Sequence, residues 1–288
     1  MTGPHPLRAL GLAAMAALLG VVATAPTAAQ KPAEASAPRW PELERKQKAR
    51  ITKLTKDLRQ AKDPEVMAKL EADIADLGAA AAPRLLDLLS DYRKNINPSL
   101  TRVLDSVTVA EHAPLLAQRA SDKRVAVRRY VVQRLSGFGL PEMAPIFREA
   151  RKDEEADIAF QASIGLCAAG DMDALPEIFE RCVGEWADIR ERLAQPLEAI
   201  RGIKASRKVL ALMRGDDDRR QIAGLRLLRL VGEKAVKGLI APYLDTEVHG
   251  VKKEAINALR VVVDGEPPLD ELSVFQAIEM AKTWKEKL

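Results

Sequence analysis

Few residues of this 288-residue chain are suited to acid–base, nucleophilic or metal chemistry. It has three histidines, at 5, 112 and 249, and two cysteines, at 167 and 182. A structural zinc module needs four Cys or His ligands, and the sequence has no nucleophile elbow, phosphate loop or dinucleotide motif. Its acidic clusters stand where helices are expected to begin, which complements the helix dipole. We therefore expect no catalytic set, no bound metal and no cofactor.

The two cysteines are not expected to form a disulfide. Cys167 and Cys182 fall on two antiparallel helices joined by a turn near 170–173. Counted from that turn, they differ by about six residues, or roughly 9 Å along the helix axis. With ~8–10 Å between the two axes, the Cα atoms lie beyond the ~7 Å that a disulfide allows. We predict two free thiols that fill space in the core.

A repeat of 31 residues is the strongest pattern in the sequence. Pro83, Pro114, Pro145 and Pro176 stand 31 residues apart, and each opens an apolar segment. Proline is tolerated in the first turn of a helix, so each marks a helix start. The count continues without proline at 207 and 238. Twenty-one positions after each of these six starts the residue is always leucine: Leu104, Leu135, Leu166, Leu197, Leu228 and Leu259.

Each repeat unit is predicted to be a helical hairpin. A helix of about ten residues precedes a polar turn, and a second helix follows with apolar residues at i, i+4 and i+7. Neither helix buries its apolar face alone, so the hairpins must stack. The composition agrees, because Ala and Leu dominate, Thr, Tyr and Phe are scarce, and aromatic residues make up 4% of the chain. The sequence thus predicts an all-α fold, a right-handed α-solenoid of about seven antiparallel hairpins.

The repeat region is one of four predicted segments. Residues 1–29 combine a short basic start, an apolar run and small residues, which is typical of a signal peptide cleaved after Ala29; an uncleaved anchor is the alternative. Residues 30–41 are rich in Pro and Ala and predict a disordered spacer. The solenoid covers 42–268, with a first, basic hairpin at 42–78, and 269–288 form a C-terminal capping helix. We expect a periplasmic or secreted protein without a membrane span after cleavage.

The second helices of the units resemble HEAT repeats, in particular the short bacterial units of the phycobilin lyase group. The match is carried by DKRVAVRRYVVQRLSGFG at 122–139, with Asp122 as the expected helix cap, and less closely by 216–233 and 244–262. The resemblance implies a superhelical surface for binding but no single activity. A cofactor-acting lyase or isomerase is the alternative that the lyase relatives suggest. Those relatives act on cytoplasmic proteins, which the export signal disfavours.

HEAT-like proteins also include metal-binding hydroxylases that act on a lysine-derived side chain and bind metal through His-Glu pairs. Here Glu111-His112 has the reverse order and occurs once. A two-iron site would need several ligands in facing units. We therefore expect His112 to be a surface residue near a helix start.

The concave side of the stack is the predicted partner site. In HEAT-type stacks the second helices line this side, which places positions 15, 19 and 22 of each unit in a groove. These residues are apolar in the middle units and basic on either side, which suits a protein or peptide with acidic ends. An error of one residue in helix phase would bury some of them. The candidate groove residues are Arg129, Gln133, Phe160, Ile164, Arg226, Arg229, Lys253, Asn257 and Arg260, with Cys167 and Ile222 at equivalent positions.

Charge is concentrated in the first helix. Residues 39–62 hold nine basic and three acidic residues, whereas 141–200 carry a net charge of −8. The acidic middle and the export signal both argue against nucleic acid as a partner. The predicted function is a non-catalytic, protein- or peptide-binding scaffold of the bacterial envelope or exterior, and docking on an anionic envelope surface is a further alternative. The candidate docking residues are Arg45, Lys46, Lys48, Arg50, Lys53, Lys56 and Arg59.

Overall fold

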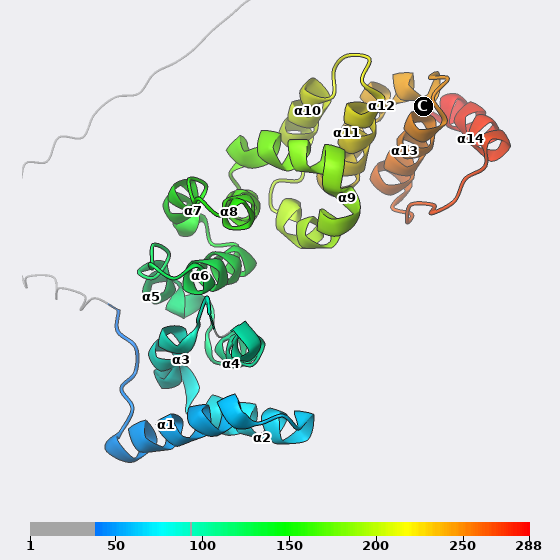
Figure 1. Cartoon of the computed structure of the whole chain (residues 1–288). Helices are drawn as coiled ribbons and strands as arrows, with labels where there is room; N and C mark the ends of the chain where they lie inside the picture. Colours follow the sequence, from blue (N-terminus) through cyan, green and yellow to red (C-terminus); the bar gives the residue numbers. More distant parts are fainter. Residues whose placement is uncertain (1–37, 93) are drawn as a thin grey trace, which may run out of the picture. The chain divides into compact units, whose positions relative to one another are not determined.

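The regular structure of the chain is helical throughout the part that the computed structural model describes, residues 38–92 and 94–288 (Figure 1). This confirms the all-α prediction. The predicted signal peptide, 1–29, and residues 30–37 of the predicted spacer lie outside the described residues. No helix of the described part is both long and apolar enough to cross a membrane. The α-helices are α1 Arg45–Gln60, α2 Pro64–Ala75, α3 Ala82–Leu88, α4 Asn97–Val107, α5 Ala113–Ala117, α6 Val125–Phe138, α7 Ala144–Ala150, α8 Ala156–Ala168, α9 Leu175–Glu198, α10 Ile203–Leu212, α11 Asp218–Val231, α12 Lys237–Ile240, α13 His249–Leu259 and α14 Val274–Lys287.

The helices before α14 pair into seven hairpins, as the 31-residue period predicts. In the fifth unit both helices belong to α9, whose backbone leaves helical geometry at Glu185 (φ −126°, ψ 22°). The part of α9 after this kink takes the place of the unit's second helix. The second helices contact one another in chain order, from α2 through α4, α6, α8, α9 and α11 to α13. This is the stacked arrangement of a solenoid; its handedness stays a prediction.

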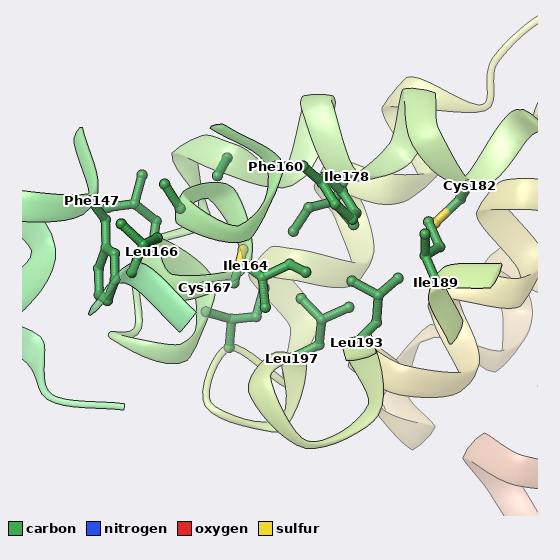
Figure 2. Close-up of a cluster of buried hydrophobic side chains, with 14 of the residues drawn as sticks. Phe147, Phe160, Ile164, Leu166, Cys167, Ile178, Cys182, Ile189, Leu193 and Leu197 are labelled. Carbon is green, nitrogen blue, oxygen red and sulfur yellow. The ribbon is translucent and has the colours of Figure 1, made fainter. Parts of the chain in front are cut away.

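Two columns of apolar side chains form the core of the stack. The six repeated leucines from Leu104 to Leu259 are each 0% exposed. The apolar residues two positions after each unit start, such as Phe147 and Ile178, are also 0% exposed. Fully burying one such side chain is worth about 1.5–3 kcal/mol. Figure 2 shows the middle of this core, where Phe147 of α7 and Leu166 of α8 lie among the buried side chains of neighbouring helices.

The N-terminus of α6 is capped from the preceding hairpin, and the expectation that Asp122 caps it is wrong. The carboxylate of Asp91 accepts hydrogen bonds from the backbone N–H groups of Val125, at 3.1 Å, and Ala126, at 2.6 Å. The Asp122 carboxylate instead accepts from the guanidinium of Arg124 and from its backbone N–H, each at 3.0 Å, so it bonds the residue before the helix and not the first turn. The hydrogen bond from the guanidinium holds the pKa of the Asp122 carboxyl well below its usual range. A carboxylate from one hairpin thus fixes the start of the next.

The disordered spacer predicted for residues 30–41 extends too far along the chain. Residues 38–41 are described, and the Trp40 ring stacks on the ring of His112 with 5.2 Å between the centroids. Trp40 also packs against the core of the stack. This aromatic contact positions a segment that composition alone marks as disordered.

The C-terminal helix begins later than the predicted 269. Residues 265–273 have no regular structure, and α14 starts at Val274 because the Ser273 hydroxyl accepts from the backbone N–H of Gln276 at 3.3 Å. α14 packs on α13. Its buried residues are Ala277, Ala281 and Trp284.

Alanine substitutions at two glycines test the packing of α7 against α8. Alanine is favoured over glycine in a helix by about 1 kcal/mol. A Cβ at Gly137 of α6 would meet nothing within 4 Å, whereas a Cβ at Gly165 of α8 would lie 2.5 Å from the Phe147 ring. We predict that Gly137→Ala raises the free energy of unfolding by up to about 1 kcal/mol. Gly165→Ala should lower it by about 1–3 kcal/mol. Urea denaturation measures both, and equal changes would contradict this packing.

Candidate functional site

A hollow of about 570 Å³ lies between the second part of α9, α11, α13 and the segment before α14. We call it the arginine pocket. Stacking of three second helices brings together residues that lie between positions 186 and 270 of the sequence. The polar and aromatic residues that define the pocket are Trp186 and Arg190 of α9, Arg226 and Arg229 of α11, and Lys253 and Glu254 of α13.

One buried carboxylate organises the arginines of this pocket. The Glu254 side chain is 8% exposed, and its oxygens lie 3.1 Å from Arg226 Nε and 3.2 Å from Arg229 Nη2. Both guanidinium groups also approach the face of Trp186, at 5.7 Å and 5.5 Å from the ring centroid. These contacts hold the two guanidinium planes in fixed positions, with a cation–π contribution from the ring.

The pocket carries more positive than negative charge. Burial lowers the pKa of Arg229, the charge of Glu254 opposes this, and the charges of Arg226 and Arg190 add to the lowering. Arginine nevertheless remains protonated in proteins. The pocket therefore holds three guanidinium groups and one buried carboxylate, which pairs with Arg226 and Arg229 but not with Arg190. Lys253 adds a fourth cation, and the exposed acids Glu191 and Asp270 lie at the rim.

The remaining wall of the pocket is a non-helical part of the chain that α13 holds by its backbone. The Asn257 amide donates to the carbonyl oxygen of Leu269 at 3.1 Å and accepts from the N–H of the same residue at 2.8 Å. Lys253 Nζ donates to the backbone carbonyl of Asp270. Arg260 Nε donates to the carbonyl of Pro267 at 3.3 Å. One face of α13 and the residue that follows it thus bind a peptide segment, which here is the chain's own.

The structure brings four of the nine predicted groove residues together in this pocket: Arg226, Arg229, Lys253 and Asn257. Arg260 lies near it and pairs with Glu266 at 2.9 Å. Arg129 and Gln133 lie in a separate hollow between α4 and α6. The residues predicted to line one groove are therefore divided between two separate hollows.

The prediction that apolar residues line the centre of the groove is wrong. Phe160 is 5% exposed, and Ile164 and Cys167 are 0% exposed, so all three belong to the core (Figure 2). The cause is α9, which packs along α8. Its residues Arg181 and Arg192 lie over the Phe160 ring, at 4.7 Å and 5.3 Å from the centroid.

Of the six polar and aromatic residues that define the pocket, three are absent from the sequence-based candidates: Trp186, Arg190 and Glu254. For Glu254 the repeat carries no clear signal. It occupies position 16 of its unit, where Tyr130 and Ala223 are buried but Gln161 and Arg192 are partly exposed. This position accepts both apolar and charged residues, so only the structure identifies Glu254 as a buried carboxylate, which needs a partner.

The residues first considered for chemistry lie elsewhere and are not grouped. Cys167 and Cys182 are buried free thiols, and desolvation raises the pKa of each to about 12, so neither is a nucleophile at neutral pH. His112 accepts a hydrogen bond at Nδ1 from the Val109 N–H at 3.1 Å. Within residues 38–92 and 94–288, no group of three or more His, Cys, Asp or Glu side chains is placed to hold a metal ion.

Comparison with known proteins gives little further information. No protein-family model matches the sequence, and no curated protein matches it significantly. One solved structure that the chain is similar to is human deoxyhypusine hydroxylase in complex with glycerol. The two are 16% identical, the match covers 83% of this chain and 97% of the other, and the TM-score is 0.35. Similarity at this level says nothing about activity or ligand.

The shared carboxylate of Glu254 can be tested by stability. Glu254→Gln keeps the shape of the side chain but leaves Arg226 and Arg229 without a counter-charge. We expect the free energy of unfolding to fall by about 2–4 kcal/mol, because breaking a buried ion pair leaves an uncompensated charge.

The control for this prediction is Asp270→Asn, which removes an exposed carboxylate at the rim of the same pocket. Urea denaturation at low salt should show a change within about 0.5 kcal/mol for this variant. Equally small effects of the two substitutions would contradict the role assigned to Glu254.

Proposed function

We propose that this chain is a non-catalytic scaffold of the bacterial envelope or exterior that binds a protein or peptide through the arginine pocket. The observation that carries the proposal is the arrangement of Arg226 and Arg229 around Glu254 against the Trp186 ring. Arginine and tryptophan are enriched among the residues that dominate binding energy in protein interfaces. Guanidinium groups stay charged at all relevant pH values, so the pocket is better suited to recognition than to proton transfer.

The geometry of the repeat supports the same proposal. A stacked array of hairpins presents its second helices side by side, and such surfaces are used for binding extended partners. α13 already holds one non-helical segment through its backbone. The proposed location depends on residues 1–29, whose pattern is that of a signal peptide.

Charge reversal at the rim of the pocket tests this function. Arg190 and Ala194 are both exposed on α9. We expect an affinity-tagged full-length chain to recover one dominant partner from its source organism. Arg190→Glu/Ala194→Glu should reduce that recovery about tenfold or more, because like charges across an interface cost several kcal/mol. Quantitative mass spectrometry of the purified material measures the recovery.

Lys204→Glu on the exposed surface of α10 is the control for this experiment. It should recover the partner as well as the parent chain does, and thermal melts establish whether all three chains fold alike. Equal recovery by the pocket variant would contradict the assignment of the site. Turnover of a small molecule by the purified chain, with no protein partner recovered, would contradict the scaffold role.

The first helix supports a second candidate function, docking on an anionic envelope surface. Arg45, Lys46, Lys48, Arg50, Lys53, Lys56 and Arg59 are all exposed on α1. The buried residues Ile51, Thr55 and Leu58 lie on the opposite side of the helix. Among the described residues, Arg50 alone of these seven cations forms an ion pair, with Asp73 at 3.1 Å. Clusters of this kind gain about 1 kcal/mol per basic residue near an anionic membrane.

Vesicle binding tests this second candidate. The chain should bind vesicles that contain phosphatidylglycerol but not vesicles of phosphatidylcholine alone, and binding should weaken steeply between low and physiological salt. Lys46→Glu/Lys53→Glu/Lys56→Glu should abolish sedimentation with the anionic vesicles. The triple variant Lys204→Glu/Arg207→Glu/Lys234→Glu has the same change in net charge and should still sediment. Salt-insensitive binding, or equal losses in both variants, would exclude α1 as the docking surface.

A further inference from the structure

The face of α13 that carries Lys253 and Asn257 holds a peptide backbone. The Asn257 side chain, 1% exposed, makes a pair of hydrogen bonds to the N–H and carbonyl of one residue, Leu269. Such a pair reads the backbone and not the side chain of the residue that it binds. Two prolines, Pro267 and Pro268, favour extended conformations in the residues before them. Residues 266–270 therefore demonstrate how this face accommodates a non-helical peptide.

Beside this segment the arginine pocket has guanidinium groups whose positive charge is not fully compensated by carboxylates. Glu254 is shared between Arg226 and Arg229. Arg190 is exposed and has no ion-pair partner within the described residues. The guanidinium group presents donors in a fixed fork that matches a carboxylate or phosphate oxygen pair. The unoccupied donors of Arg190 and Arg226 thus favour an anionic group in the pocket.

The rim of the pocket restricts the charge of that group. Glu191 and Asp270 are both exposed there, and they repel a ligand that carries several negative charges. A carboxylate brings one negative charge, whereas a phosphate or nucleic acid brings more. The apolar walls formed by Leu230, Val261 and Leu269 suit an apolar residue next to the carboxylate. These features together favour a peptide over a free inorganic anion.

We propose that the arginine pocket binds the carboxylate of a peptide that lies beside residues 266–270, with Arg190 and Arg226 as the groups that contact it. This inference rests on the proposed scaffold function and specifies its ligand. The carboxylate belongs either to an Asp or Glu side chain or to the C-terminus of the partner. Both sources offer the same two oxygens to the guanidinium groups.

A peptide array separates these sources. Random nine-residue peptides are synthesised in three versions: a central Glu with an amidated C-terminus, a central Gln with an amidated C-terminus, and a central Gln with a free C-terminal carboxylate. The purified full-length chain should bind a subset of sequences about tenfold or more tightly in one carboxylate version than in the amide version, because hydrogen bonds to charged groups dominate such a difference. The carboxylate version that binds more tightly identifies whether the bound carboxylate is that of a side chain or that of the C-terminus.

Two variants establish whether the pocket causes this preference. Arg190→Gln removes an exposed guanidinium that the fold does not need, and it should bring the ratio between carboxylate and amide versions close to one. Lys204→Gln on α10 should leave the ratio unchanged. Equal binding of all three versions, or an unchanged ratio in Arg190→Gln, overturns the carboxylate inference and leaves peptide binding intact. Binding of no peptide in any version contradicts the proposed function itself.

Discussion

The fold depends on burial between neighbouring repeats, because a single hairpin cannot cover its own apolar face. The leucine at position 21 of the last six units is completely buried, and the second helices of successive units contact one another along the stack. In such an array each repeat is stabilised by its neighbours. The two ends need special coverage, and α14 provides it at the C-terminal end with Ala277, Ala281 and Trp284. This dependence determines which residues remain available for binding.

The arginine pocket is a consequence of the same stacking. α9, α11 and α13 each contribute residues from equivalent faces, but α9 bends at Glu185, and its second part carries Trp186 to the pocket wall. Glu254 then holds Arg226 and Arg229 in place. A buried carboxylate with two guanidinium partners is a costly arrangement for stability alone. Its cost is consistent with a site that is preorganised for an anionic partner.

The hairpin arrangement was predictable because its information lies in spacing along the chain. The site was only partly predictable because equivalent positions have different neighbours. Ile164 and Arg226 occupy the same position of their units, yet Ile164 is buried under α9, whereas Arg226 lines a pocket. The cap on α6 comes from Asp91, 34 residues before Val125. Contacts of this kind, which join different units, leave no periodic signal in the sequence. The pocket wall formed by Leu269 leaves none either.

The measurement that tests the central claim most directly is photo-cross-linking in cells at the rim of the arginine pocket. A benzoyl-phenylalanine at Ala194 would lie at the pocket, and the same residue at Lys204 on α10 serves as the matched position. Our account predicts that the Ala194 position captures one envelope protein, through a peptide with an Asp, a Glu or a C-terminal carboxylate close to the cross-link, and that the Lys204 position does not. Capture of the same proteins at both positions, or of peptides without such a carboxylate, would contradict it.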